Sequence, residues 1–384
     1  MKVGLDLVEE GKIEVRNKDV GLIVNHTSFS SNLNYIFEIF EKNGAKIKAI
    51  FSPEHGVYGS QREGEKVENQ KLENKAPVYS LYGKNLKPTK EMLEGLDLLV
   101  YDIQDVGARF YTYISTMLYS FHSANENGVK FLVLDRPNPI GGNLVEGPIL
   151  KDELRSFVGA YNVPIRYALT PGELATLYAK ENGIDNFEVV KLEGWKRSML
   201  FDETDLPWIF PSPNMPSLTS ALLYPGLCLF EGTNLSVGRG TAKPFEMIGA
   251  PWIDEQNLAK KLREYLKQEQ VGVVPIRFIP HSSKYKDELC KGVYFVIRDK
   301  KKLKSVSVAI KVICELIQTY EKNFEWEEYT LEDGKRIDHF SLLSGDNKIR
   351  KLIESKEKPE EIIAAWNEED KAYLKRIEKI KHYE

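Results

Sequence analysis

The chain has 384 residues, of which 42% are hydrophobic and 29% are charged, and its formal net charge is −4. This length is typical of two domains, and the composition is that of a water-soluble globular protein. The small negative charge argues against a nucleic-acid surface, so we expect no nucleic-acid partner. The cysteines Cys228, Cys290 and Cys314 are widely spaced and form no C-x-x-C motif, which argues against a disulfide framework or a zinc ribbon.

The start of the chain lacks the apolar segment of a signal peptide. Furthermore, no apolar run approaches the roughly 20 residues that a membrane helix needs. As written, the sequence predicts a soluble cytoplasmic protein without a membrane span. If an export signal was trimmed from it, we expect an exported protein instead. The sequence does not set the oligomeric state.

Buried strands alternate with amphipathic helices in the first part of the chain. Strands are expected over 20–25, 45–52, 96–103, 129–135 and 186–195, and helices over 32–43, 90–94, 112–128 and 170–183. This alternation predicts an α/β fold, a Rossmann-like parallel sheet with helices on both faces. Thr170, Pro171 and Glu173 form a helix-start signature with a capping box, so we interpret Glu173 as structural.

The character of the chain changes after the proline-rich segment 211–217. Residues 229–252 are rich in loop-forming residues, and a helix over 254–268, strands near 274–279 and 291–298 and a helix over 303–321 are expected to follow. Beyond Phe324 we expect charged helices with an apolar stripe of Ile362, Ile363, Trp366, Tyr373 and Leu374. We therefore expect a Rossmann-like N-terminal domain, 1–228, and a smaller α/β C-terminal domain, 229–384, which closes a cleft.

Polar loops rich in glycine and proline follow most of the predicted strands. Active sites of α/β proteins are built from loops beyond the carboxyl ends of strands. The loops therefore predict an enzyme with a polar cleft. Their sequences are FSPEHG (51–56), YDIQDVGARFYTY (101–113), LDRPNPIGGNLVEGP (134–148), PSPNMPS (211–217) and LFEGTNLSVGRGTAKPFE (229–246).

The FSPEHG loop presents a carboxylate beside an imidazole. Its proline and glycine force a turn directly after a strand, so Glu54 and His55 are expected to point outward as acid/base and orienting group. An exposed polar turn without a function is the alternative. Asn25 and His26 lie where the strand 20–25 passes into the next loop, and we assign this loop to the same cleft. The charged residues 53–75 lack periodicity and predict a long functional loop.

The YDIQDVGARFYTY loop brings Asp102, Gln104, Asp105 and Arg109 within eight residues. Acids so close to an arginine can hold a proton on one carboxyl group or anchor an anionic ligand. An ion pair between Asp105 and Arg109 that caps the next helix is an equally good interpretation. Tyr111 is expected to line the cleft.

The remaining loops supply an amide, a carboxylate and a cation. Asn214 can hydrogen-bond an acetamido or hydroxyl group, or satisfy the backbone of its own loop. Arg239 stands between two glycines and is interpreted as an anion clamp, with Glu231 and Asn234 in the same loop. Glu146 is a weaker candidate.

Several site classes have no signature in the sequence. A phosphate loop and a dinucleotide fingerprint are missing, which argues against a nucleotide site. The histidines lack metal-ligand spacing, and no G-x-S-x-G serine motif occurs. We therefore expect no metal and no cofactor.

The ordered motifs carry a family resemblance. GLIVNHTSF, FSPEHGVYG, DIQDVGARFYTYIST, LDRPNPIGG, VEGP, PSPNMPS, EGTNLSVGRGT and PFEMIGAPW resemble the bacterial exo-β-N-acetylmuramidase family (NamZ-like) over residues 20–252, and the C-terminal third fits more loosely. The resemblance implies a Rossmann-like domain and a smaller α/β domain with the site between them. It also implies release of terminal N-acetylmuramic acid from the non-reducing end of peptidoglycan fragments. Many relatives are exported, whereas this sequence shows no signal.

The resemblance implies that Glu54 is catalytic, and glycosidase chemistry usually needs a second carboxylate. Asp105 and Glu231 are the candidates, unless the acetamido group of the sugar is the nucleophile and the carboxylate only orients it. The lactyl carboxylate of muramic acid needs a cation, for which Arg109 and Arg239 are the candidates. The other predicted substrate-binding residues are Asn25, His26, His55, Gln104, Tyr111, Asn214 and Asn234.

The expected partner is thus a peptidoglycan-derived disaccharide or glycan. Two alternatives stay open at this point. One is a cell-wall sugar-binding protein without turnover, because fold alone does not set function. The other is a hydrolase of an ester or amide bond in wall fragments, although this option lacks a recognisable nucleophile.

Overall fold

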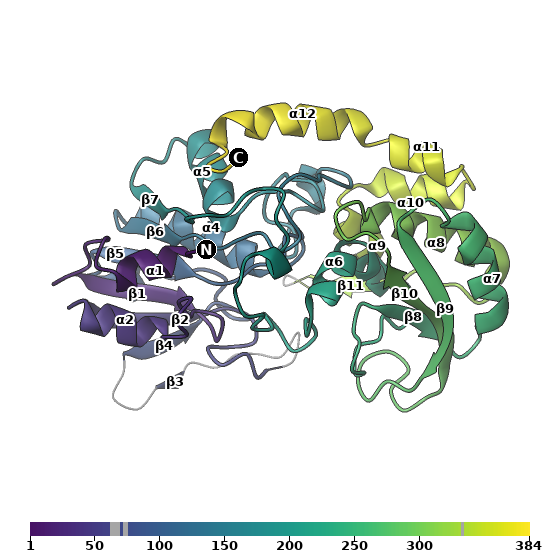
Figure 1. Ribbon diagram of the computed structural model, residues 1–384, viewed down its shortest axis with the longest axis horizontal. Coiled ribbons are helices and arrows are strands. Elements are labelled where there is room, and N and C mark those ends of the chain that lie inside the picture. The colour runs from purple at the N-terminus through teal and green to yellow at the C-terminus, as the bar shows by residue number, and fades with distance from the viewer. Residues whose placement is uncertain (62–69, 72–75, 332–333) are drawn as a thin grey trace.

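A seven-stranded sheet forms the N-terminal half of the protein in a computed structural model, which describes residues 1–61, 70–71, 76–331 and 334–384 (Figure 1). Much of the predicted loop 53–75 therefore lies outside the described residues. The strand order is β3-β4-β2-β1-β5-β6-β7, and all neighbours pair in parallel except β3 with β4. The strands are β1 (Asp19–Val24), β2 (Lys46–Ser52), β3 (Gln70–Lys71), β4 (Pro77–Ser80), β5 (Leu98–Asp102), β6 (Lys130–Leu134) and β7 (Phe187–Val190).

Helices cover both faces of this sheet because successive strand residues point to opposite sides. Leu22 and Val100 face an apolar layer shared with α1 (Gly4–Glu9) and α2 (Ile36–Lys42). Their neighbours Ile23 and Leu99 face the layer of α4 (Tyr113–Glu126) and α5 (Pro171–Asn182). This arrangement confirms the predicted fold class. The sequence missed α1 and β4, and the short helix α3 (Lys90–Leu93) was expected.

The chain direction across the sheet reverses at β1. From β1 the chain proceeds outward to β2 and β4, and it then returns to place β5 on the other side of β1. Ligands of open α/β sheets bind beyond the carboxyl ends of strands near such a reversal. The loops that follow β1, β2 and β5 meet at this edge, and they are the loops that carry the predicted site residues.

The C-terminal half contains a smaller antiparallel sheet. Its strand order is β8-β10-β9, and apolar residues of α7 and α8 share a core with it. A two-stranded hairpin follows, so the expectation of helices alone beyond Phe324 was wrong. The elements are α6 (Leu218–Leu227), β8 (Met247–Ala250), α7 (Glu255–Tyr265), β9 (Val271–Phe278), β10 (Cys290–Ile297), α8 (Ser305–Tyr320), β11 (Glu328–Thr330), β12 (Arg336–Asp338), α9 (His339–Ser344), α10 (Asn347–Glu354), α11 (Pro359–Ala364) and α12 (Asn367–Ile377).

The last residues of the chain return to the first sheet. In Figure 1, α12 runs from the C-terminal half back toward α5. Ile362, Trp366 and Tyr373 of the expected apolar stripe are buried, whereas Leu374 is exposed. The backbone N–H of His382 donates to Glu173 at 2.8 Å, and the Tyr383 hydroxyl donates to Asp135 at 2.5 Å. The division of the chain at residue 228 stays a prediction.

Two buried ion pairs hold the loops at this end of the sheet. Arg136 donates two hydrogen bonds to Asp102, at 2.5 and 2.9 Å, and thereby joins the ends of β5 and β6. Glu173 completes the predicted capping box with Thr170, and it also accepts hydrogen bonds from Arg197 at 2.7 and 2.8 Å. The structural interpretation of Glu173 is confirmed.

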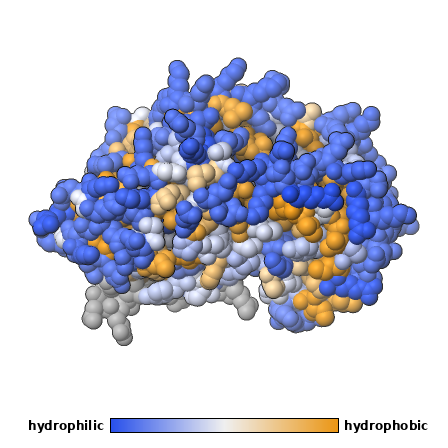
Figure 2. Space-filling view, in the orientation of Figure 1, coloured by the Kyte–Doolittle hydropathy of each residue, from blue (hydrophilic) through white to orange (hydrophobic). Residues whose placement is uncertain are grey.

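Hydrophilic side chains cover most of the face shown in Figure 2, and hydrophobic ones form limited patches. One patch lies over the small sheet, where Val274 of β9 and Val296 of β10 are each 43% exposed. No helix among the described residues is both long enough and apolar enough to cross a membrane.

Candidate active site

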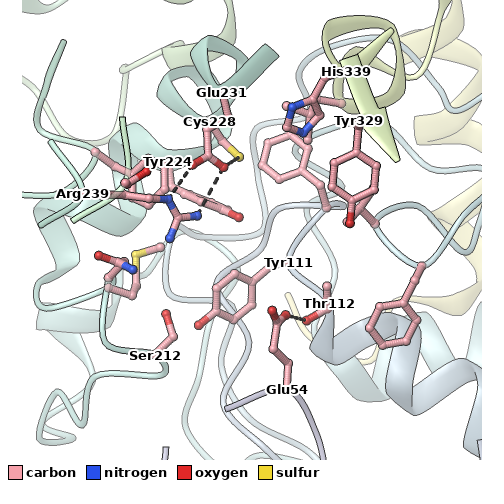
Figure 3. A pocket seen from close by; sticks show the side chains of 18 of the residues that line it. Glu54, Tyr111, Thr112, Ser212, Tyr224, Cys228, Glu231, Arg239, Tyr329 and His339 are labelled. Atoms are coloured by element: carbon pink, nitrogen blue, oxygen red, sulfur yellow. Dashed lines mark hydrogen bonds and ion pairs between the residues drawn. The ribbon is translucent and has the colours of Figure 1, made fainter. Parts of the chain in front are cut away.

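A pocket of about 430 Å³ lies between the loops of the large sheet and the C-terminal half (Figure 3). Its walls combine the loops after β2 and β5 with several residues between 212 and 245 and with residues 283–284, 327–329, 339 and 343. The structure therefore brings together loops that are far apart in the sequence. The predicted site residues that line it are Glu54, His55, Tyr111, Asn214, Glu231 and Arg239.

The loop after β2 positions Glu54. β2 ends at Ser52, and a turn follows in which His55 and Gly56 both adopt left-handed backbone conformations, with φ of 72° and 76°. This conformation is uncommon for a residue other than glycine and is often found at functional sites. His55 Nδ1 is 2.7 Å from the carbonyl oxygen of Gln61, which holds the turn. The Thr112 hydroxyl, at the start of α4, donates to Glu54 Oε2 at 2.7 Å.

Glu231 and Arg239 form an ion pair on another wall of the pocket. Arg239 Nε donates to Glu231 Oε1 at 2.5 Å, and a second guanidinium nitrogen donates to Oε2 at 3.2 Å. Burial raises the pKa of Glu231, but the charge and hydrogen bonds of Arg239 outweigh it and hold this pKa below its ordinary value. Glu231 is therefore ionised at neutral pH. Figure 3 shows Glu54 and the Glu231–Arg239 pair in different parts of the pocket, with Tyr111 between them in this view.

The C-terminal half contributes groups that the sequence analysis missed. Lys284 donates to the carbonyl oxygen of Glu231 at 2.9 Å and pairs with Glu327 at 2.8 Å. Tyr329 and His339 lie side by side, with ring centroids 4.9 Å apart. Burial lowers the pKa of His339, which favours the neutral imidazole. These residues lie where only charged helices were expected or where the sequence carried no recognised motif.

Aromatic side chains form much of the remaining wall. Tyr111 makes edge contacts with Tyr113 and Tyr224, with ring centroids 4.9 and 5.7 Å apart. Burial raises the pKa of Tyr111 well above its ordinary value, so its hydroxyl stays neutral. Phe110 and Phe157 also line the pocket. Apolar rings beside hydroxyl and carboxylate groups suit the mixed surface of a sugar.

Asp105 and Gln104 lie beside the pocket but do not line it. Asp105 is 2% exposed and accepts hydrogen bonds from Gly107 N at 2.6 Å and from the Tyr167 hydroxyl. Burial raises its pKa to about 6, against the lowering effect of these hydrogen bonds. Gln104 donates to the carbonyl oxygens of Asp105 and Pro137 at 2.8 and 2.9 Å. Both side chains brace the loop after β5.

Arg109 is also turned away from the pocket. Its guanidinium donates to the carbonyl oxygens of Pro148, Val163 and Leu343 at 2.8, 2.9 and 2.7 Å. The side chain is 1% exposed, and it forms neither the predicted anion anchor nor the alternative ion pair with Asp105. Arg109 points away from the pocket because it bonds three carbonyl oxygens, and these come from segments that are distant in the sequence.

The other predicted residues stabilise loops around the site. Asn25 Oδ1 accepts hydrogen bonds from the backbone and side chain of Thr27, at 2.8 and 2.7 Å. His26 Nε2 is 2.7 Å from the carbonyl oxygen of Phe210. Asn234 binds the backbone at 323 and 325, and buried Glu146 accepts two hydrogen bonds from Ser307. None of these four side chains lines the pocket.

The fold and the pocket define a class of protein. A parallel sheet, a smaller antiparallel sheet and an acid-containing pocket between them are typical of an α/β enzyme that acts on a polar ligand. Among the described residues, no group of three or more histidine, cysteine, aspartate or glutamate side chains is placed to bind a metal ion.

Comparison with known proteins then gives the family. Two family models match: "Exo-beta-N-acetylmuramidase NamZ, N-terminal" at residues 20–219 and "Exo-beta-N-acetylmuramidase NamZ, C-terminal" at 222–383. The chain belongs to this NamZ family, which confirms the resemblance seen in the sequence. It is 44% identical over 370 residues to the peptidoglycan beta-N-acetylmuramidase NamZ of Bacillus subtilis (strain 168), covering 95% of this chain and 87% of the relative.

Solved structures agree with this assignment. Two crystal structures of DUF1343 family proteins from Bacteroides fragilis NCTC 9343 superpose over 100% of this chain and 99% of theirs. The first has a TM-score of 0.89 at 34% identity, and the second has a TM-score of 0.75 at 28% identity. The whole chain, including its C-terminal third, thus follows the fold of these proteins.

Proposed function

We propose that this protein is an exo-acting β-N-acetylmuramidase, which releases terminal N-acetylmuramic acid from the non-reducing end of peptidoglycan fragments. The chain belongs to the NamZ family over almost its full length, and its curated relative has this class of activity. The observation that carries the proposal is that Glu54 and Glu231 line one pocket from different walls. Glycosidases typically place two carboxyl groups around the bond that they cleave.

Glu54 is the general acid in this proposal. It protonates the oxygen of the leaving sugar as the bond from that oxygen to the anomeric carbon breaks. The Thr112 hydrogen bond fixes the direction of the carboxyl group, and the His55 turn fixes its backbone. Water later adds to the anomeric carbon, and Glu54 takes up the proton of that water, which restores the enzyme.

Glu231 is the second carboxylate. Its ionised state suits either direct attack on the anomeric carbon or orientation of the sugar's acetamido group as an internal nucleophile. Asp105 was the other candidate for the second carboxylate. We assign the role to Glu231 because Asp105 is buried and does not line the pocket. In both routes a negative charge near the anomeric carbon stabilises the positive charge that develops there.

Arg239 is the proposed partner of the lactyl carboxylate, with Lys284 beside it. A guanidinium can bind one carboxylate through two donors and still present others to a second acceptor. The pocket also contains Glu54, Glu231, Glu327 and Glu328, so glutamates outnumber the two cations. Recognition of an anionic sugar therefore depends on directed hydrogen bonds rather than on an overall positive field.

The experiment is hydrolysis of a chromogenic β-N-acetylmuramic acid glycoside, with the β-N-acetylglucosamine glycoside beside it. We expect release from the muramic substrate alone. Glu54→Gln, which keeps the shape but cannot donate the acid proton, should lower kcat by about 10²- to 10⁴-fold. Glu357→Gln, a change in an exposed glutamate of the C-terminal half, is the matched control and should keep the wild-type rate.

Three results would contradict the proposal. Wild-type turnover by Glu54→Gln would remove the acid assignment. Equilibrium binding of the disaccharide without any product after long incubation would favour a sugar-binding protein. Hydrolysis of an ester or amide of a wall fragment, lost in Glu54→Gln, would assign the pocket to another bond.

A further inference from the structure

A second concave site of about 730 Å³ lies between α4 and α5, on the N-terminal half of the protein. Tyr119 and His122 of α4 form one side of it, and Tyr178 of α5 forms the other. Lys87 and Arg155 complete its rim. None of these residues has a part in the mechanism proposed above.

Two chain segments connect this second site to the catalytic pocket. In the segment 82–87, Tyr82 lines the catalytic pocket and Lys87 lines the second site. In the segment 155–160, Phe157 lines the catalytic pocket and Arg155 lines the second site. The two concave sites therefore share their dividing walls and are neighbours on one surface.

The turn 156–159 lies between the two sites, and Phe157 is buried in it at 4% exposure. Ser156 and Gly159 exchange backbone hydrogen bonds at 3.2 and 3.0 Å, so Phe157 stands at the tip of a tight turn. Its ring centroid lies 5.8 Å from that of Tyr82 and 6.0 Å from that of Tyr119. Tyr82, Phe157 and Tyr119 thus form a row of contacting rings between the two sites, in which Phe157 is buried and the two tyrosines are partly exposed.

The chemistry of the second site suits an amino-sugar chain with acidic substituents. Tyr119 and Tyr178 are half-buried and offer part of their rings, whereas Tyr161 is buried and its hydroxyl donates to Glu181. The side chains of Lys87 and Arg155 are 49% and 51% exposed, and each can shift toward an anion while its carboxylate partner stays in water. Glycans are bound by this combination of flat apolar surface and polar edges.

We propose that the second site binds the leaving-group side of the glycan, beyond the sugar that adjoins the cleaved bond. This inference rests on the proposed function. An exo-acting enzyme holds the terminal sugar in its catalytic pocket, so the rest of a long substrate must leave that pocket on the leaving-group side. Tyr82 at the catalytic pocket and Tyr119 at the second site, on either side of the turn 156–159, provide the surface for it. The protein then prefers glycan chains to the isolated disaccharide.

The experiment compares kcat/KM for the disaccharide and for the tetrasaccharide of the same repeat, with products identified by mass spectrometry. We expect wild type to favour the tetrasaccharide by about tenfold, the size of effect that one or two contacts of this kind produce. In Tyr119→Ala and in Arg155→Ala, the ratio of the two kcat/KM values should fall toward one. Arg277→Ala is the matched control, since Arg277 is an exposed arginine of β9 in the small sheet and is paired with Glu255 of α7.

Each of the following outcomes would contradict the inference, and the outcomes can be told apart. Equal kcat/KM values for the two substrates in wild type, or an unchanged ratio in both variants, would refute the second site and leave the muramidase activity intact. A preference that follows a peptide on the disaccharide rather than glycan length would assign the surface to the peptide. Hydrolysis of neither substrate by wild type would refute the proposed function, and the second site with it. If Tyr119→Ala does not fold, Arg155→Ala still tests the inference, because Arg155 is on the surface and its loss should not unfold the protein.

Discussion

Replacement of Glu231 by glutamine separates the two roles that this residue could have. Glutamine keeps the size of the side chain and one acceptor oxygen, but it removes the negative charge. The lowered pKa of Glu231 favours its ionised form. In the structure Glu231 accepts two hydrogen bonds from Arg239 and contacts the Cys228 thiol at 3.6 Å. A purely positioning role would act through Arg239, whereas a catalytic role would act on the sugar itself.

The expected magnitudes differ enough to decide between these roles. A hydrogen bond between ionised groups contributes about 1.5–3 kcal/mol. The side chains of Glu231 and Arg239 are 20% and 13% exposed, so water can replace part of the lost interaction and the lower end applies. Misplacement of Arg239 alone would thus cost about tenfold, mainly in KM. Loss of a catalytic carboxylate costs about 10²- to 10⁴-fold in kcat.

We expect Glu231→Gln to lower kcat for the muramic glycoside by at least about 100-fold, because Glu231 is the second carboxylate in the proposed mechanism. The measurement is kcat and KM determined separately, with unfolding temperature as a check on folding. Arg239→Gln is the comparison, and it should raise KM more than it lowers kcat. A loss for Glu231→Gln that is tenfold or less and confined to KM would refute the catalytic role.

Three further predictions concern the frame around the site. Thr112→Val removes the donor to Glu54 and should lower kcat about tenfold. The control Thr176→Val, at a threonine of α5, should not lower kcat. Equal rates for the two variants would contradict the orienting role of Thr112. Asp105 has a folded pKa of about 6 against about 3.9 in an unfolded chain, so the folded state binds more protons between these values. Its contribution to the unfolding free energy should therefore fall by about 3 kcal/mol in total as the pH rises from about 3 to about 7, with about 2 kcal/mol of that loss between pH 4 and pH 6, and stay level above. Urea titrations should show that Asp105→Asn lacks this slope. An identical pH dependence in wild type and variant would disprove the assignment. Arg197→Met leaves Glu173 buried without its partner and should lower the unfolding free energy by about 3–5 kcal/mol. The control Lys130→Met, in an exposed pair, should lower it by less than about 1 kcal/mol. Similar losses for the two variants in chemical denaturation would contradict this prediction.

Local sequence patterns were sufficient for the central strands of the parallel sheet, although β4 was missed. The strands at 19–24, 46–52, 98–102 and 130–134 were predicted to within a few residues, because buried parallel strands are short apolar runs between polar turns. The helix at 171–182 was predicted from its capping box, which acts within four residues. The hairpin β11–β12 was missed, since its short strands lie among charged residues without a clear alternation.

The candidate site was only partly predictable. Glu54 was found because a proline and a glycine surround it directly after an apolar strand, and all three features lie within one short segment. Arg109 and Arg239 could not be ranked in the same way. Both arginines lie in glycine-containing polar loops, Arg109 after Gly107-Ala108 and Arg239 after Gly238, but only Arg239 reaches the pocket. Arg109 binds carbonyls at 148, 163 and 343, and no local pattern records where those carbonyls lie.

The sequence by itself therefore determined the fold class, the family and the loop that carries the proposed acid, because each of these depends on residues close together in the chain. The tertiary structure decided which polar side chains share one pocket. It placed Glu231, Lys284 and His339 near Glu54, and it buried Asp105 behind the wall. The physical reason is that hydrogen bonds and packing between segments hundreds of residues apart choose whether a polar group faces the cavity or satisfies the backbone.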